Sequence, residues 1–292
     1  MFLVGAGGIK PSSPYFFDRT RIYSDPLPRN PMLIGNTRIG GIGSLSVKNT
    51  YDADALAYLT AVEAADGQAL ESSVKSAINT FVVGCKADGI WTAIKASCIL
   101  AGARTYLGAL VPLAGTAPTN NGFGSGDYSR KLGLLGDGAS KFIDTNRSNS
   151  ADGINSKHFS VYLSVSNDHT ATRYFGGTRN ATGNTFLGNT AGTNLFRLGA
   201  SLSVISSSAI FGLFGASRPS DILVNYIFNS SVASISNITT GLLSDNIDIF
   251  RRGTDANYYN SRISFYSIGT SIDLALLDTR ITTLMTTLNA LL

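Results

Sequence analysis

The most regular pattern along the chain is an alternation of apolar and other residues from position 159 to position 165. The segment reads Phe-Ser-Val-Tyr-Leu-Ser-Val, with an apolar residue at each odd-numbered position. Successive side chains of a β-strand point to opposite faces of a sheet, so this spacing places the apolar residues on one face. The pattern predicts a half-buried strand over residues 159–165.

Seven more short segments between residues 129 and 270 have the β-branched and aromatic composition of strands. Turn signals such as Gly176-Gly177 and Gly183-Asn184 separate them. Short strands at this spacing predict an antiparallel β-sandwich. The expected strands are 172–176, 184–188, 195–198, 209–216, 222–228, 246–251 and 262–267.

Apolar residues at helical spacing between positions 52 and 110 predict three short helices. Asp52 or Asp54 is suited to cap the first helix, because a carboxylate accepts the free N–H groups of a helix start. Each helix is too short to be stable alone, so we expect a packed bundle. The three apolar sets are Leu56, Leu59 and Val62; Leu70, Val74, Ala77, Ile78 and Phe81; and Ile90, Ile94, Cys98 and Ala101.

A last helix is predicted over residues 271–292, where leucine and isoleucine recur at alternating steps of three and four. The opposite face is rich in threonine instead of the Glu and Lys of a solvated coiled coil. Two interpretations stay open, because the stripe can pack on its own chain or form a seam between sister subunits. The seam would consist of Leu277, Ile281, Leu284 and Leu288.

The first 51 residues contain five of the eight prolines, so no long helix or central strand can run through them. The same stretch is rich in aromatic and aliphatic residues, which a disordered tail would lack. We interpret it as an extended arm that orders on a partner, with a flexible terminus as the alternative. The expected anchoring residues are Tyr15, Phe16, Phe17, Ile22 and Tyr23.

The predicted fold class is therefore α+β, with a β-sandwich between helical segments. The arm covers residues 1–51, a helical module 52–110, a linker 111–128, the sandwich 129–270 and the C-terminal helix 271–292. Pro112, Pro118 and the run Asn120-Asn121-Gly122 identify the linker as a loop.

Charged residues make up only 14% of the chain, well below the share of about 25% that is typical of soluble domains, and the net charge is +4. Lysine and arginine form no run of five, so we expect no nucleic-acid partner. No apolar stretch approaches about 18 residues and the start lacks a charged leader, so we expect no membrane insertion and folding in the cytoplasm. Cys85 and Cys98 are expected to be buried free thiols.

Several segments resemble phage proteins that carry concanavalin-like, laminin-G-like jelly rolls. The run Gly-Leu-Leu-Gly-Asp-Gly from Gly133 to Gly138 is similar to their opening strand, and the stretch from Arg262 to Asp278 is similar to their last strand and closing helix. Residues 58–71 and 84–91 resemble a helical module that precedes such domains in tail and virion proteins. The resemblance implies a jelly-roll sandwich, location in a virion and frequent contact with glycans, and it does not imply an enzyme.

Candidate catalytic groups are few. His158 and His169 are the two histidines, and no Gly-x-Ser-x-Gly nucleophile motif is present, so we expect surface histidines. Glycoside hydrolysis needs two carboxylates about 5–10 Å apart, yet no glutamate follows residue 71. We expect a non-enzyme without cofactor or metal, with aspartates in loops and turns. These are Asp137, Asp144, Asp152, Asp168, Asp221, Asp245, Asp248 and Asp255.

Glycan binding does not require charge, because aromatic faces and neutral hydrogen-bonding groups hold sugars well. The turn Asp255-Ala-Asn-Tyr-Tyr-Asn combines both kinds of group, although tyrosines at strand ends are ordinary. The candidate residues are Arg179, Asn180, Tyr258, Tyr259 and Asn260, with Arg173 and Tyr174 beside them.

These features together predict a virion structural protein, most simply a tail fibre or related exterior tail component that contacts the host surface, with glycans as a candidate ligand. Its partners would be other virion proteins and further copies of itself, with a trimer favoured. A capsid decoration protein is the alternative, and a glycan-degrading enzyme is a third hypothesis.

Overall fold

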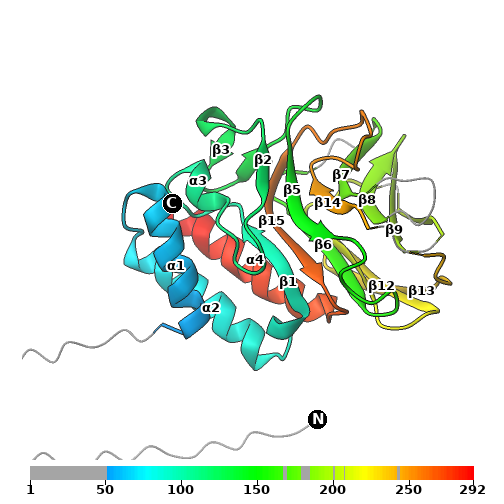
Figure 1. Cartoon of the computed structure of the whole chain (residues 1–292), viewed down its shortest axis with the longest axis horizontal. Coiled ribbons are helices and arrows are strands. Elements are labelled where there is room, and N and C mark those ends of the chain that lie inside the picture. The colour runs from blue at the N-terminus through cyan, green and yellow to red at the C-terminus, as the bar shows by residue number, and fades with distance from the viewer. Residues whose placement is uncertain (1–50, 167–169, 179–184, 200, 207, 242–243) are drawn as a thin grey trace, which may run out of the picture. The chain divides into compact units, whose positions relative to one another are not determined.

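Two antiparallel β-sheets pack face to face, and helices cover the outer side of one of them (Figure 1). The computed structural model describes residues 51–292 except 167–169, 179–184, 200, 207 and 242–243. The described residues cluster as one compact unit. The proposed anchoring residues Tyr15, Phe16, Phe17, Ile22 and Tyr23 lie outside the described residues.

The first sheet, sheet A, is the one that the helices cover. Its strand order is β13-β12-β11-β6-β15-β4-β3, and β1 pairs with β15 beside β4. The bounds are β13 (Ser231–Ser236), β12 (Leu223–Phe228), β11 (Gly212–Arg218), β6 (Lys157–Leu163), β15 (Arg262–Gly269), β4 (Gly133–Leu135), β3 (Tyr128–Ser129) and β1 (Ile94–Ile99).

The second sheet, sheet B, has the order β10-β9-β8-β7-β14-β5-β2. The bounds are β10 (Ser203–Ser206), β9 (Thr193–Leu198), β8 (Thr185–Thr190), β7 (Arg173–Gly177), β14 (Asn246–Ile249), β5 (Phe142–Ser148) and β2 (Thr119–Asn121). All eight strands expected between residues 159 and 267 are present, and the predicted α+β fold with an antiparallel sandwich is confirmed.

The sandwich core fills the space between the sheets with aromatic and aliphatic side chains. Phe175 of β7 is central, because its ring centroid lies 4.8 Å from that of Tyr259 and 5.7 Å from that of Phe214, both in edge-on contacts. Edge-on packing suits the ring quadrupoles and adds to the free energy gained by burial.

Strand β6 is buried on both faces, which corrects the expectation of a half-buried strand. Phe159 and Val161 face the sandwich core, whereas Tyr162 packs into a second core that includes Phe265 and Leu277. The helices shield this second face from water. The alternation in the sequence could not reveal that helices cover this face, because tyrosine and serine are tolerated both on exposed and on buried faces of a sheet.

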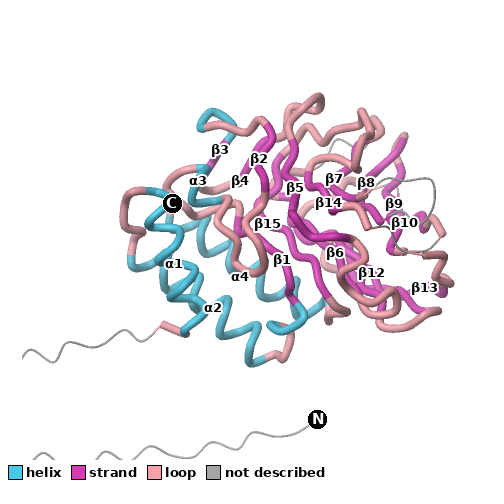
Figure 2. Tube along the Cα trace, viewed as in Figure 1, coloured by secondary structure: helices cyan, strands magenta, loops and turns pink. Residues whose placement is uncertain are grey.

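The helices are α1 (Ala53–Asp66), α2 (Ser72–Ala87), the short α3 (Tyr106–Ala109) and α4 (Leu274–Leu291), with 3-10 turns at Trp91–Ala93 and Ser125–Asp127 (Figure 2). Asp52 caps α1 as expected, since its carboxylate accepts from the backbone N–H of Asp54 at 3.0 Å. Among the described residues, no helix combines the length and apolar character needed to cross a bilayer.

The third expected helix is wrong. The apolar residues Ile94 and Cys98 belong to β1, which pairs antiparallel with β15 so that Ser97 lies opposite Ser267. Five of the six β1 side chains are buried, on both faces of the strand, and a short run of this kind fits a covered strand as well as a helix. Residues 119–121 of the expected linker likewise form β2, which pairs with β5.

The apolar stripe of α4 packs within its own chain. Its four seam residues are at most 2% exposed, and they lie in the second core together with side chains of α1, α2 and sheet A. The alternative of packing on the same chain is therefore confirmed. The proposed oligomer seam of Leu277, Ile281, Leu284 and Leu288 is wrong, because these side chains are buried against other elements of their own chain.

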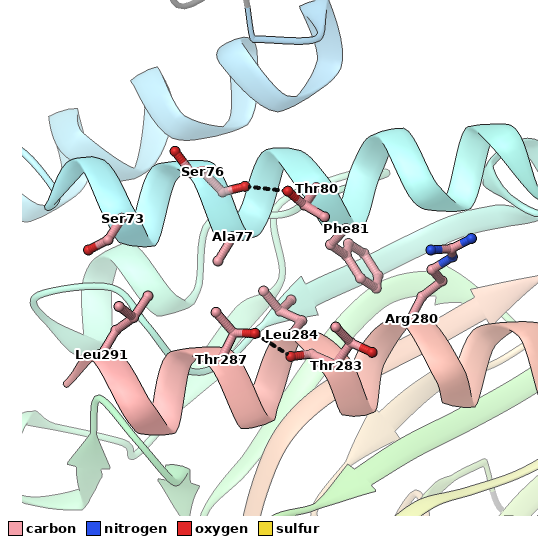
Figure 3. Close-up of a pocket in the computed structure, with 10 residues that line it drawn as sticks. All are labelled: Ser73, Ser76, Ala77, Thr80, Phe81, Arg280, Thr283, Leu284, Thr287 and Leu291. Atoms are coloured by element: carbon pink, nitrogen blue, oxygen red, sulfur yellow. Dashed lines mark hydrogen bonds between the residues drawn. The ribbon is translucent and has the colours of Figure 1, made fainter. Parts of the chain in front are cut away.

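Helices α2 and α4 lie side by side, and a groove of about 380 Å³ runs between them (Figure 3). Ala77 and Phe81 point from α2 toward Leu284 of α4 at its floor. Thr80 and Thr287 turn their hydroxyls back to carbonyls of their own helices, at 2.9 and 2.8 Å. Cys85 and Cys98 are buried free thiols, as expected.

Candidate functional site

The side of sheet B that points away from sheet A is here called the open face, and it carries polar and aromatic side chains of the strands. Along β14, Ile247 and Ile249 enter the sandwich core, so Asp248 between them points outward. Along β5, Ile143 points inward and Phe142 and Asp144 point outward by the same alternation. None of the described helices covers this face (Figures 1 and 2).

Strand register aligns the outward side chains across the open face. Asp248 lies opposite Asp144 on one side and opposite Gly177 on the other. Phe186 of β8 then lies opposite both Gly177 and Arg197 of β9. The aligned positions therefore run across five neighbouring strands, β5, β14, β7, β8 and β9.

One end of the open face contains a hollow of about 320 Å³, here called the arginine hollow. Small-molecule sites have volumes of about 300–1,000 Å³, so this hollow is at the lower end of that range. Among the described residues, no acidic side chain lines it. Its lining residues are Tyr174, Phe186, Thr190, Leu195, Arg197, Leu202 and Arg252.

Arg252 is held in the arginine hollow by two aromatic rings and one carboxylate. Its guanidinium carbon lies 4.0 Å from the ring centroid of Tyr174 and 4.7 Å from that of Phe186. Its Nε donates to the Asp255 carboxylate at 2.6 Å. Stacking and ion pairing together fix the direction of the guanidinium.

Gly188 explains how Tyr174 reaches this position. A Cβ at residue 188 would lie 2.6 Å from the Arg173 carbonyl oxygen and 2.8 Å from Cδ1 of Tyr174. Only glycine leaves room for the Tyr174 ring to lie over the neighbouring strand. The ring then meets Phe186 edge-on, with centroids 5.3 Å apart.

A second hollow of about 300 Å³, here called the carboxylate hollow, lies beside β14. Burial raises the pKa of Asp248 to about 7, although the Arg251 guanidinium opposes this with an Nε–Oδ2 contact of 2.7 Å. Asp144 accepts from the Asn246 side chain at 3.0 Å. The hollow is lined by Asp144, Asp245, Asn246, Asp248, Arg251, Gly253 and Thr254.

Asp144 and Asp248 correct the expectation that the aspartates lie in loops and turns, because both are on strands. Outward-facing strand positions accept carboxylates when cross-strand neighbours can pair with them, and the pairing could not be read from the sequence. Arg251 also stacks on Phe142, with its guanidinium carbon 3.1 Å from the ring centroid. The Arg251 Nη1 group donates to the Tyr258 hydroxyl at 3.3 Å.

Tyr259 is not at the surface, which contradicts its proposed contact with glycans. The side chain is fully buried in the sandwich core, and its backbone N–H donates to the Phe250 carbonyl at 2.7 Å. Tyr258 is half-buried beside Arg251, and Asn260 is exposed but lines neither hollow. Arg179 and Asn180 lie outside the described residues.

The sequence did not single out Phe142, Phe186, Arg197, Arg251 or Arg252. Phe186 and Arg197 come together only because β8 and β9 pair in one register. The single local signal was the dipeptide Arg251-Arg252 at the end of an expected strand. Arg173 is on β7, half-buried, and does not line the arginine hollow.

His158 is fully buried, so the expectation of a surface histidine is wrong. Its ring nitrogens contact the Thr270 carbonyl at 2.5 Å and the Ser267 hydroxyl at 2.7 Å. Burial lowers the pKa of His158 to about 4. His169 lies outside the described residues, within which no three His, Cys, Asp or Glu side chains are grouped to hold a metal.

No family model matches the chain, and no curated protein matches it. Similar solved structures include the botulinum neurotoxin serotype D binding domain, with 13% identity and a TM-score of 0.46, covering 65% of this chain and 50% of that one. A serotype D ligand binding domain in complex with N-acetylneuraminic acid gives 13% identity and a TM-score of 0.45, with coverage of 65% and 50%.

The binding domain of Paraclostridial Mosquitocidal Protein 1 gives 11% identity and a TM-score of 0.37, covering 57% of this chain and 51% of that one. The chain thus spans about half the length of the structures that it matches. Likeness of this degree assigns no ligand or activity to the chain.

Proposed function

We propose that the chain is a non-enzymatic attachment protein whose sandwich binds glycans of a host cell surface through the open face of sheet B. The observation that carries this proposal is the combination of aromatic rings and hydrogen-bonding groups around two hollows on an uncovered face. Sugars bind by packing their apolar C–H faces on aromatic rings while hydroxyls and amides exchange hydrogen bonds.

The partners of the two strand carboxylates favour binding over catalysis. Asp248 is paired with Arg251, and Asp144 accepts from Asn246. A glycosidase needs one free carboxylic acid and one carboxylate on either side of the scissile bond. Carboxylates that are paired in this way are better suited to holding neighbouring side chains in place on the open face than to proton transfer.

The virion role rests on the resemblance of residues 58–71, 84–91, 133–138 and 262–278 to phage tail and virion proteins. In this proposal the chain is a tail fibre or related exterior tail component, and repeated copies multiply weak host contacts. A trimer is the favoured assembly and the arm is the attachment to other virion proteins. A capsid decoration protein is the second candidate, since the same arm would hold a shell.

A glycan array probed with the full chain tests the binding function. We expect binding to a subset of glycans, and Tyr174→Ala to weaken it at least about fivefold, since truncating a central binding aromatic commonly costs more than 1 kcal/mol. Tyr106→Ala, on α3 and outside both hollows, is the matched control. Absence of any glycan binding, or release of oligosaccharide from host polysaccharide, would contradict the proposal.

The location of the chain in an assembled particle tests the virion role. Labelling of intact particles should place the chain on the tail, and mass photometry should give three copies. A position on capsid symmetry axes would favour the decoration protein instead. A chain found in neither place would overturn both.

A further inference from the structure

We infer that the arginine hollow binds a sugar residue that carries a carboxylate. This inference rests on the proposed glycan-binding function and names the class of glycan. The two hollows of the open face differ in charge, since three aspartates and one arginine line the carboxylate hollow, whereas two arginines and no acidic residue among those described line the arginine hollow. An acidic sugar would therefore be repelled from the first hollow and attracted to the second.

Arg197 supplies the first half of the site. Its Nε is shut away from water, and it has no hydrogen-bond partner within the described part of the chain. A buried donor without an acceptor is costly, and a ligand oxygen would satisfy it. Arg197 lies directly opposite Phe186 in the strand register, and both side chains line the hollow.

Arg252 supplies the second half. Asp255 engages only its Nε and Nη2. Nη1 therefore has no acceptor among the residues that the structure describes. The Arg252 side chain does not have to move in order to bind a ligand, because Tyr174 and Phe186 hold the guanidinium plane. A planar guanidinium that is held in place forms charge-assisted hydrogen bonds with a planar carboxylate more readily than a mobile lysine would.

The rest of the hollow suits the sugar ring that carries the acid. Leu202 is 47% exposed and Leu195 is buried beside it, so the hollow has an apolar wall next to the two arginines. A carboxylate without an attached ring would leave this wall in contact with water. An acidic sugar presents a charged group and an apolar C–H face together, and it fits both surfaces.

The test compares the full chain's affinity for an acidic oligosaccharide, such as an oligouronide or a sialylated oligosaccharide, with its affinity for the same molecule after carboxyl reduction. Reduction removes the charge and keeps the ring. We expect Arg197→Gln to weaken binding of the acidic form at least about tenfold, and to weaken any binding of the reduced form much less, because the reduced form has no charge to lose. Lys131→Gln is the control, since Lys131 is exposed outside the hollow and the charge change is equal.

The outcomes separate the two proposals. Equal affinity for the acidic and reduced forms, with binding still sensitive to Tyr174→Ala, would overturn the acidic ligand and leave glycan binding in place. A sulfated oligosaccharide that binds more tightly than the carboxylated one would also overturn the inference. Failure to bind any glycan would overturn both. Equal melting temperatures of the wild type and the Arg197 variant exclude misfolding as the cause.

Discussion

Arg280 of α4 and Asp88 at the end of α2 form a bidentate ion pair, with Nε–Oδ2 at 2.6 Å and Nη2–Oδ1 at 2.7 Å. The pair connects the last helix of the chain to the second one. Gly84 lies beneath the arginine side chain, where a Cβ would approach Arg280 Cδ to 2.9 Å. The missing side chain at residue 84 thus allows the guanidinium to reach the end of α2.

The Arg280 guanidinium lowers the pKa of Asp88 below its ordinary value, so ionised Asp88 stabilises the folded chain. This contribution is present above the ordinary aspartate pKa and is lost as the pH falls through the lowered pKa. We expect Asp88→Asn to lower the thermal midpoint slightly at pH 7, because partly exposed pairs contribute little. The difference should shrink in high salt and at low pH, and a difference insensitive to both would contradict the ion pair as its cause.

Ile281→Ala should destabilise the chain by about 2–5 kcal/mol, as expected for a buried aliphatic side chain in a packed core. Ile281 is fully buried between α4 and its neighbours, so truncation leaves a cavity. Urea unfolding of the purified chain measures the effect. Thr279→Ala, on the exposed side of the same helix, should change stability by no more than about 0.5 kcal/mol. A small effect at residue 281 would mean that α4 does not pack as described.

Acid should destabilise the folded chain through His158. Its pKa of about 4 in the folded chain is below the ordinary 6.5, so the unfolded chain binds the proton more tightly. The contribution is complete above pH 6.5 and is lost as the pH falls toward 4, by about 3 kcal/mol in all. Urea unfolding across this pH range measures the loss.

The control for this pH dependence is His158→Gln, which cannot titrate. Its free energy of unfolding should fall less steeply between pH 6.5 and pH 4 than that of the wild type, whatever its value at neutral pH. Lys157, whose pKa burial lowers to about 7, stays charged in both states at the lower end of this window. Parallel curves for the two proteins would show that His158 does not cause the acid sensitivity.

Gly188→Ala should weaken glycan binding although it removes no polar group. The added methyl would collide with the Arg173 carbonyl and the Tyr174 ring, which would displace the ring from Arg252. We expect a loss of affinity similar to that of Tyr174→Ala, measured by the same array. Gly126→Ala, where a Cβ meets no atom within 4 Å, should bind normally. Unchanged affinity of the Gly188 variant would show that Tyr174 is not part of the binding site.

The sequence by itself determined the elements whose signal is local. The strands between residues 159 and 267, the cap at Asp52 and the last helix follow from side-chain alternation, a carboxylate before a helix and a heptad of leucines. Each of these signals lies in residues that are only a few positions apart in the sequence. That proximity is why they could be predicted without knowledge of the fold.

Only the tertiary structure decided what depends on partners far along the chain. Residues 94–99 are apolar at helical spacing, yet pairing with β15 makes them a strand. Tyr258 and Tyr259 are adjacent in sequence, but the turn places one beside Arg251 and the other in the core. The arginine hollow likewise arises from the register of β7, β8 and β9, because the free energy of strand pairing is set by contacts that no local pattern specifies.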